Sequence, residues 1–380
     1  MFNIIILGIT SLLTDISSEM IYPLLPVFLV TTLGASPAIL GLIEGIAESL
    51  ASMLKVFSGY SSDKTKTRKP LTILGYAGSA FGKIFIYIST GWGHVFAGRL
   101  IDRLGKGIRT APRDALIIDS AKEGKRGAAF GLHRAMDSLG ASLGVFISYL
   151  LIVHYRGNIK SVFLFSLIPA FLGVLFLFLV KEKKRELKPG VERPKFKWHA
   201  LDKKLKLFLI FTFIFTLGNS SNQFLLLRAK NMGSPLALVI LFYLVYNIVY
   251  CLAAYPASRL SDKIGRRNLL VFGYLFYGLV YLGFAVNNSP GILWLLFGIY
   301  GLYMGFTDGV EKALVADIAP SQLRATTIGL HAALVGVGLF PASLLAGMLW
   351  QYFGPAAPFY FGGFMGILSS FGLWFILRGI

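Results

Sequence analysis

Residues 113–135 read RDALIIDSAKEGKRGAAFGLHRA, and residues 311–333 read EKALVADIAPSQLRATTIGLHAA. At a constant offset of 198 residues the two stretches share polar positions as well as apolar ones, including Asp119 with Asp317. A second pair of stretches repeats Ser-Asp-Lys, at residues 62–64 and 261–263. Repeated polar residues at a nearly fixed spacing predict that the chain is built from two similar halves in the same orientation.

The composition is typical of a membrane protein. Of the 380 residues, 55% are hydrophobic and 14% are charged, whereas a soluble domain carries roughly 25% charged residues. The net charge of +19 would suggest nucleic-acid binding in a soluble protein, but here it indicates basic loops that set membrane orientation. We therefore expect a lipid bilayer and no nucleic acid as partner. The single cysteine, Cys251, excludes a disulfide within the chain and a cysteine-based metal site.

A helix needs about 20 mostly apolar residues to cross a bilayer. The stretches that qualify are 3–30, 38–60, 71–90, 94–117, 128–153, 160–180, 205–228, 236–258, 269–287, 291–316, 326–349 and 356–378. The sequence therefore predicts an all-α polytopic membrane protein with twelve transmembrane helices in two parallel six-helix repeats. We expect an N-terminal half at 1–180, a basic cytoplasmic linker at 181–204 and a C-terminal half at 205–380. The first helix is expected to be retained, because no signal-peptide features precede it.

The loops predict the orientation of the chain. With a cytoplasmic N-terminus, the inner loops and the ends of the spans that adjoin them hold 24 of the 37 Lys and Arg residues. The outer loops and the adjoining span ends hold 4. Basic residues are enriched on the cytoplasmic side of membrane proteins. Both termini are therefore expected in the cytoplasm, with the protein in the cytoplasmic membrane.

The loop between the second and third predicted spans resembles the signature loop of the major facilitator superfamily. It runs from Gly59 through Asp63 to Arg68 and Lys69. It lacks the family's usual Gly before the basic pair and has one extra residue. The resemblance extends over essentially the whole chain and implies the major facilitator fold. Numbering the twelve predicted spans in chain order as helices 1 to 12, the resemblance implies that helices 1, 4, 7 and 10 line a central cavity.

The resemblance also implies a gate at the cytoplasmic ends of both halves. An Asp at a helix end accepts N–H bonds from a neighbouring helix start, and an Arg pairs with an acid at the end of helix 4 or helix 10. The C-terminal copy of the loop is closer to the family pattern, and Asp119 and Asp317 stand where the family places the paired acid. The expected gate residues are Gly59, Asp63, Arg68, Asp119, Asp262, Arg266 and Asp317. The alternative is a pair of solvated loops that only set topology.

Two further features resemble the family and depart from it. In helix 4, Arg99 is followed by Asp102, but Arg103 stands where the family usually has Gly. Helix 5 contains Gly140 and Gly144 but lacks the Gly-Pro element of the superfamily's drug antiporters. The direction of transport therefore stays open at this stage.

Charged residues inside the predicted spans are the main candidates for function, because each costs at least about 2.5–3.5 kcal/mol at the bilayer centre. Helix 1 carries Asp15 and Glu19 below Pro23 and Pro26, which are expected to bend or break it. We expect these acids to face a basic stripe on helix 4, either as structural ion pairs or as proton carriers, with Glu19 the first candidate. The residues expected in proton coupling or in the central cavity are Asp15, Glu19, Asp102, Arg103, Lys106, Arg109, His133 and Asp137.

Other polar residues suggest substrate contacts. Helix 7 contains a polar run at 219–223 that follows Gly218, which predicts a weakened helix whose side chains bind either a substrate or neighbouring helices. On helix 2, Glu44 and Glu48 share a face, and at least one is expected to meet a base. The substrate-binding candidates are Arg99, Asn219, Asn222, Gln223, Asp308 and Glu311.

No motif of an enzyme, an ATP-driven motor, a cofactor site or a metal site appears in the sequence. We therefore expect a monomeric, proton-coupled secondary transporter of a small organic solute, with export modestly favoured. The alternatives are an importer of an organic anion or metabolite and an exporter of a metal or metal chelate. A lipid translocator and a sensor that does not transport represent different classes.

Overall fold

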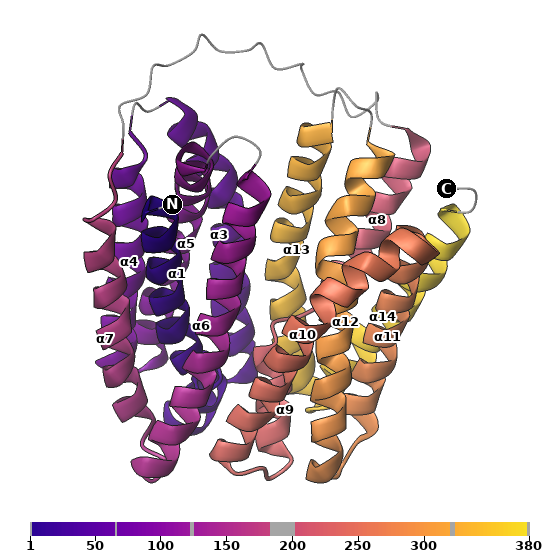
Figure 1. The fold of residues 1–380 in the computed structure, drawn as a ribbon. Helices are drawn as coiled ribbons and strands as arrows, with labels where there is room; N and C mark the ends of the chain where they lie inside the picture. The colour runs from indigo at the N-terminus through magenta and orange to yellow at the C-terminus, as the bar shows by residue number, and fades with distance from the viewer. Residues whose placement is uncertain (1, 65–66, 122–124, 183–201, 320–323, 378–380) are drawn as a thin grey trace. The chain divides into compact units, whose positions relative to one another are not determined.

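The computed structural model describes residues 2–64, 67–121, 125–182, 202–319 and 324–377, and every regular element in these ranges is a helix (Figure 1). Most of the predicted linker, residues 183–201, lies outside the described residues. The first half of the chain contains α1 (Phe2–Ile21), α2 (Leu25–Val27), η1 (Phe28–Thr32), α3 (Pro37–Lys64), α4 (Lys69–Tyr87), α5 (Trp92–Ser120), α6 (Arg126–His154) and α7 (Ile159–Leu177). The second half contains α8 (Lys203–Gly218), α9 (Gln223–Asn231), α10 (Leu236–Ile264), α11 (Arg266–Val286), η3 (Pro290–Ile292), α12 (Leu293–Ile318), α13 (Arg324–Phe353) and α14 (Ala357–Ile376).

Two predicted spans are broken, and both breaks were expected from the sequence. The first span stops at Ile21 and resumes as α2 and the π-helix η1, with Pro23 in the intervening turn. A proline lacks the N–H that would continue the helix, and its ring clashes with the preceding turn. The seventh span divides into α8 and α9, with residues 219–222 between them. These results confirm the bend in helix 1 and the weakened helix 7.

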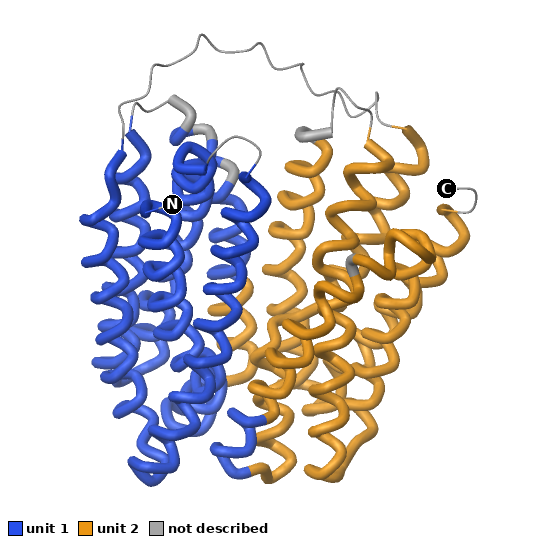
Figure 2. Tube along the Cα trace, in the orientation of Figure 1, with its two compact units in different colours: residues 1–35, 46–189, 235–241 blue, residues 36–45, 190–234, 242–380 orange. Residues whose placement is uncertain are grey.

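The chain divides into two compact units (Figure 2). Unit 1 comprises residues 1–35, 46–189 and 235–241, and unit 2 comprises residues 36–45, 190–234 and 242–380. The units therefore differ from the predicted halves at two places, because α3 begins in unit 2 and α10 begins in unit 1. One consequence is that Glu44 and Glu48, one turn apart on α3, belong to different units.

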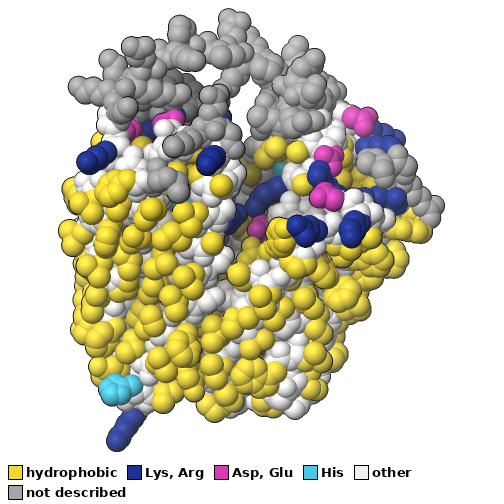
Figure 3. Space-filling model, viewed as in Figure 1, with side chains coloured by type: hydrophobic (Ala, Val, Ile, Leu, Met, Phe, Trp, Pro, Cys, Tyr) yellow, Lys and Arg dark blue, Asp and Glu magenta, His cyan; other side chains and the backbone are white. Residues whose placement is uncertain are grey.

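Apolar side chains cover much of the visible surface of both units (Figure 3). On α6 a stripe at helical spacing, Leu139, Leu143, Phe146 and Leu150, exposes 37–53% of each side chain. Such extended apolar surface requires a nonpolar surrounding. Eight stretches of the described chain are long and apolar enough to cross a membrane. The eight do not include α3, α4, the charged α5, or the pair α8 and α9. Eight such stretches are characteristic of a multi-pass membrane protein.

Glycines bring helices of unit 1 into backbone contact. A Cβ atom added to Gly140 of α6 would lie 2.5 Å from the carbonyl oxygen of Leu12, and one on Gly144 would overlap Ile16. Between α4 and α5, a Cβ on Gly75 would lie 2.6 Å from the carbonyl oxygen of Gly105. In lipid, the hydrophobic effect does not drive association between helices. Small residues at these crossings allow close van der Waals contact between the backbones, which stabilises the packing instead.

The α1–α6 contact makes a testable prediction. Gly140→Ala is expected to lower the stability of the protein by about 1–3 kcal/mol, because the added methyl group must displace the backbone of α1. The measurement is the thermal unfolding midpoint of the purified protein in detergent. The matched control is Gly131→Ala on the same helix, where an added Cβ meets no atom within 4 Å. Equal midpoints for the two variants would show that α1 and α6 do not depend on this close approach.

Candidate functional site

Helix α5 carries the predicted charged stripe, and its face is buried in unit 1. Arg99, Asp102, Arg103 and Arg109 each expose only 4–7% of their surface. Steps of three and four residues place most of these side chains on one side of the helix. Charges buried in this way require partners from neighbouring helices.

Glu48 of α3 supplies the principal carboxylate to the stripe. Its Oε1 lies 3.1 Å from Nη2 of Arg103 and 3.9 Å from Nη2 of Arg99. Asp102 adds a second carboxylate, with Oδ2 at 3.6 Å from Arg99 and 3.9 Å from Arg103. The expectation that Glu44 or Glu48 meets a base is confirmed for Glu48, which was not among the predicted site residues.

Asp15 of α1 lies among charges without a close ion pair. Lys106, Arg109 and Arg113 of α5 attract it, and Asp137 of α6 repels it. Within the described part of the chain, no Lys, Arg or His nitrogen lies within 4.0 Å of its carboxylate. One turn further along α1, Glu19 lies against α6, since a Cβ on Gly144 would approach the Cβ of Glu19 to 3.0 Å.

Lys83 of α4 belongs to the same region, and the sequence analysis overlooked it. The side chain is 2% exposed, and its Nζ lies 2.7 Å from Ser17 Oγ and 3.5 Å from the carbonyl oxygen of Thr14. Asp102 and Asp15 are the acids that attract it. A single lysine inside an otherwise apolar span was the signal that could have identified it.

The two arginines nearer the C-terminal end of α5, Arg109 and Arg113, have partners inside unit 1. Arg109 donates a hydrogen bond to Ser79, 2.5 Å away, and its guanidinium lies 4.3 Å from the centre of the Tyr76 ring. Arg113 pairs with Asp114 at 2.8 Å. Arg99 and Arg103 are engaged as well. The stripe therefore gives no support to an anionic solute, because binding a carboxylate or phosphate would require arginines that are not already paired.

His133 and Asp137 of α6 lie one turn apart, with His133 Nδ1 3.4 Å from Asp137 Oδ2. His133 is 2% exposed. Among the described residues, its Nε2 and the Oδ1 of Asp137 are buried without a hydrogen-bond partner. The two side chains thus face each other as expected from their i, i+4 spacing.

In unit 2, the polar run between α8 and α9 binds tyrosines. Asn222 accepts a hydrogen bond of 2.7 Å from the hydroxyl of Tyr300 and donates one of 3.4 Å to Tyr246. Asn219 donates a hydrogen bond of 3.3 Å to the hydroxyl of Tyr303. Two of the three predicted amides therefore hold α8 and α9 to α10 and α12, as interhelical bonding would require.

Gly218 and Gln223, on either side of the break, are buried. Tyr277 of α11 donates a hydrogen bond of 2.6 Å to the carbonyl oxygen of Gly218, which the end of α8 leaves without a helical partner. Gln223 is completely buried, and within the described residues neither atom of its amide group has a hydrogen-bond partner. Ser221 lies 3.5 Å from Glu44, which the first turns of α3 bring into unit 2.

The acids of α12 find partners inside unit 2. Asp308 pairs with Lys312 at 2.8 Å and accepts a hydrogen bond of 2.9 Å from Tyr250. Glu311 Oε1 lies 2.7 Å from Nε2 of His331 on α13. These substrate candidates lie in unit 2, whereas Arg99 is paired in unit 1.

The start of α4 is held by two acids. Arg68 pairs with Asp119 at the end of α5, at 2.6 Å. Glu182, which follows α7, accepts hydrogen bonds from the backbone N–H groups of Arg68 at 2.6 Å and Lys69 at 2.9 Å. A carboxylate at a helix start satisfies free N–H groups and complements the helix dipole. Glu182 was not predicted, and the side chain of Asp63, which was expected to do this for a helix start, lies outside the described residues.

The corresponding end of unit 2 contains the same type of pair. Arg266 at the start of α11 lies 2.5 Å from Asp317 near the end of α12 and 3.5 Å from Asp262. In the first copy, a Cβ on Gly59 would make only an ordinary contact with Ala111, at 3.5 Å. Both loops therefore join a helix start to an acid at the end of α5 or α12.

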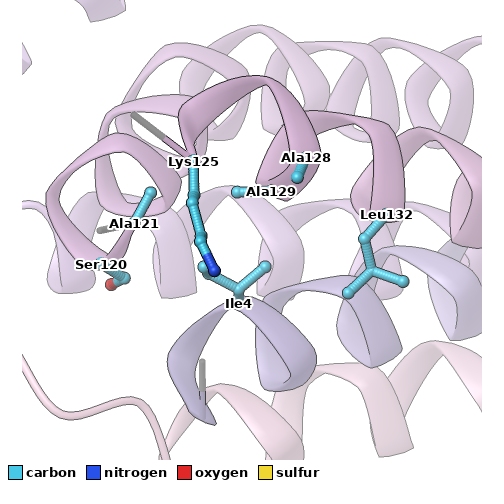
Figure 4. A pocket seen from close by; sticks show the side chains of 7 residues that line it. All are labelled: Ile4, Ser120, Ala121, Lys125, Ala128, Ala129 and Leu132. Carbon is cyan, nitrogen blue, oxygen red and sulfur yellow. The ribbon is translucent and has the colours of Figure 1, made fainter. Parts of the chain in front are cut away.

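A hollow lies at the beginning of α1 and does not coincide with the charged stripe (Figure 4). Its walls come from α1, the end of α5 and the start of α6, and Lys125 extends across it above Ile4. None of the predicted site residues lines it. The residues that line it are Ile4, Ser120, Ala121, Lys125, Ala128, Ala129 and Leu132. In the ranges that the structure describes, no three His, Cys, Asp or Glu side chains are grouped so that they could hold a metal ion.

Comparison with known proteins identifies relatives along the full length of the chain. The sequence profile of the Major Facilitator Superfamily matches residues 7–243 and 207–379. The "Uncharacterized MFS-type transporter MJ1317" of Methanocaldococcus jannaschii is 39% identical, covering 98% of this chain and 94% of that protein. The "Multidrug resistance protein MdtH" of Baumannia cicadellinicola is 24% identical, covering 88% of this chain and 80% of that protein. The crystal structure of the nucleoside transporter NupG has a TM-score of 0.81 at 14% identity, with complete coverage of both chains, and is similar in fold.

The carboxylate of Glu48 makes a second testable prediction. Glu48→Gln leaves Arg99 and Arg103 with less compensating charge, and we expect a loss of about 2 kcal/mol of stability. This is below the ~3–5 kcal/mol typical of a broken buried pair, because the Glu48 side chain is 33% exposed. Thermal unfolding of Glu48→Gln, Arg103→Gln and the double variant forms a double-mutant cycle. A coupling energy of about 0.5–3 kcal/mol is expected, and strictly additive losses would contradict the pairing.

Proposed function

The chain belongs to the major facilitator superfamily, and we propose that it is a proton-coupled secondary transporter that moves a small organic solute across the cytoplasmic membrane by alternating access. Membership places it in a family of multi-pass membrane transporters for small molecules. The proposal adds the coupling ion, the direction and the residues that carry the function. Export is the proposed direction, supported by relatives that are named multidrug resistance proteins.

The proposed architecture has twelve spans in two parallel six-helix repeats, with both termini in the cytoplasm and a monomer as the working unit. The repeated stretches at 113–135 and 311–333 support it. So does the helix order, provided that α1 to η1 count as one broken span and α8 with α9 as another. The repeated ion pairs, Arg68 with Asp119 and Arg266 with Asp317, would then form cytoplasmic gates that open when the inside is accessible.

The observation that carries the coupling proposal is the position of Asp15. It is surrounded by attracting bases, yet within the described residues no base lies within 4.0 Å. By contrast, Glu48 and Asp102 are engaged by arginines at close range. A carboxylate without a close partner can bind a proton without first breaking an ion pair. Asp15 is therefore the proposed proton carrier of unit 1. Glu19, one turn further along α1, is the second candidate because it is an acid in the same span.

The proposed solute contacts lie at the break between α8 and α9. Asn219 and Asn222 are partly exposed and already bound to tyrosines. Gln223 keeps an amide group with no hydrogen-bond partner in the described part of the chain. Buried amides and tyrosine hydroxyls offer donors and acceptors for a polar solute. This arrangement supports a neutral or zwitterionic solute better than a strongly anionic one.

Flux measurements test the function directly. Purified protein is reconstituted into liposomes with an internal pH dye, and organic cations, nucleosides, dipeptides and sugars are added one class at a time under an imposed proton gradient. Wild-type protein is expected to move protons when the right class is added. We expect Asp15→Asn or Glu19→Gln to abolish that proton movement, because neither neutral side chain can carry a proton at this site.

The control variant is Asp114→Asn on α5, an acid that is already paired with Arg113. The ratio of protons to solute molecules moved by Asp114→Asn should be closer to the wild-type ratio than the ratio for Asp15→Asn is. Solute flux that does not depend on the proton gradient would overturn the coupling and leave a facilitator. An absence of flux for all four classes, in protein shown to be folded, would favour a lipid translocator or a sensor.

A further inference from the structure

Glu311 of α12 and His331 of α13 form a closely hydrogen-bonded acid–imidazole pair inside unit 2. Glu311 Oε1 lies 2.7 Å from Nε2 of His331. The His331 side chain is 7% exposed and that of Glu311 is 16% exposed. From this geometry we infer that the two side chains form one proton-binding site in unit 2. Only the role of the bound proton in transport rests on the proposed function.

The surroundings of the pair are aromatic. The ring of Phe208 on α8 stacks on His331 at 6.2 Å, with an interplanar angle of 27°. Tyr274 of α11 and Tyr303 of α12 are the titratable neighbours that interact with Glu311. Both tyrosines are at most 2% exposed. An acid and an imidazole in such a setting must compensate each other, because water is largely excluded.

The described surroundings of Glu311 contain no permanent cation paired with its carboxylate. Within the described residues, no Lys or Arg nitrogen lies within 4.0 Å of it. On α12 itself, Lys312 is paired with Asp308, and Asp317 is paired with Arg266 of α11. The side chain of Arg324, at the start of α13, lies outside the described residues. The other described charged groups on adjoining helices are Lys203, Lys204 and Lys206 at the start of α8, Arg259, Asp262 and Lys263 near the end of α10, and Arg267 on α11. Arg267 donates a hydrogen bond to the carbonyl oxygen of Trp374.

The pair can hold one proton without losing its hydrogen bond. In the deprotonated state, the Nε2–H of neutral His331 donates to the Glu311 carboxylate, and the pair carries one negative charge. An added proton binds to Nδ1 of His331. The Nε2 proton then either stays on the imidazolium or transfers to the Glu311 carboxylate, which in turn donates to Nε2. In either case the pair becomes neutral overall, so that one proton changes the charge of the site by one unit. Histidine is the side chain best suited to such a change near neutral pH.

The repeat in unit 1 shows why this site exists in only one of the two units. At the offset of 198 residues, Arg113 stands at the position of Glu311, and His133 stands at the position of His331. A guanidinium cannot accept a hydrogen bond from the imidazole. Arg113 therefore binds Asp114, and His133 turns to Asp137 on its own helix at the longer distance of 3.4 Å.

A proton count tests the inference without any solute. Purified protein in weak buffer is titrated between pH ~5 and ~8, and the protons taken up per molecule are compared for wild type, Glu311→Gln, His331→Gln and the double variant. Because the pair holds one shared proton, the double variant should take up about one proton fewer than wild type, and neither single variant should lose more than that one proton. Asp202→Asn, at the exposed acid that accepts a hydrogen bond from the N–H of Lys203 at the start of α8, should match wild type.

Two outcomes would overturn the site. A double variant that loses two protons would show two independent groups, and unchanged counts in all variants would show an inert structural hydrogen bond. Should the variants fail to fold, labelling of wild-type protein with a hydrophobic carbodiimide, which reacts with protonated buried carboxyl groups, decides the question by mass spectrometry. Modification of Glu311 must increase as the pH falls, and modification that does not change with pH would contradict the site.

Transport provides a separate measurement of what the proton does. With a solute identified by the flux screen, Glu311→Gln should lose the stimulation of flux by a proton gradient and retain exchange of solute across the membrane. A full response to the gradient would show that the bound proton is not the coupled one. If no solute is transported, the proposed function fails, but the proton count still decides whether the site exists.

Discussion

The 3.1 Å contact between Glu48 and Arg103 reflects the constraint that governs unit 1, namely that α5 carries more positive charge than a membrane helix can hold alone. Glu48 comes from α3, Asp102 from α5 itself, and Asp15 from α1. The stripe therefore needs carboxylates from three helices, and their positions follow from it. Removing one acid exposes the remaining charges to a surrounding that cannot solvate them. The close packing of α4 and α5 through glycines places the stripe where these acids can reach it.

Unit 2 solves a different problem with different residues. Its helix break at 219–222 leaves backbone and side-chain polar groups to be satisfied, and tyrosines from α10, α11 and α12 satisfy several of them. Unit 1 is thus organised by charge and unit 2 by hydroxyl and amide hydrogen bonds within an aromatic cluster. The two halves share a repeated pattern in sequence. A single difference between them, Arg113 at the position of Glu311, accompanies a different partner for the repeated histidine.

The sequence predicted the helical membrane fold, the family, the breaks in helices 1 and 7 and the Arg–Asp ion pairs at the helix ends. These features depend on local composition, proline chemistry or a repeated motif, all of which can be recognised in one sequence. The partner of each buried charge could not be predicted in the same way. Lys83 and Glu182 were overlooked, and Glu48 was expected to meet a base that the sequence could not identify, because the partner of each depends on which helix lies beside it. Those neighbours depend on glycine contacts between segments far apart in the chain. The division of α3 between the units was equally invisible, since the helix is continuous.

The charge carried by α5 also bears on how the protein is made. An isolated segment with this many Arg, Lys and Asp side chains would partition poorly into lipid, since each costs about 2.5–3.5 kcal/mol at mid-membrane during insertion. The close backbone contact between Gly75 of α4 and Gly105 of α5 offers a way to lower this insertion cost. If α4 and α5 leave the translocation machinery together as a hairpin, part of the stripe is shielded before α6 has been synthesised. Charge pairing would then be available in the order in which the helices are synthesised, because α1 and α3 would already be in the bilayer to supply the carboxylates that α5 requires.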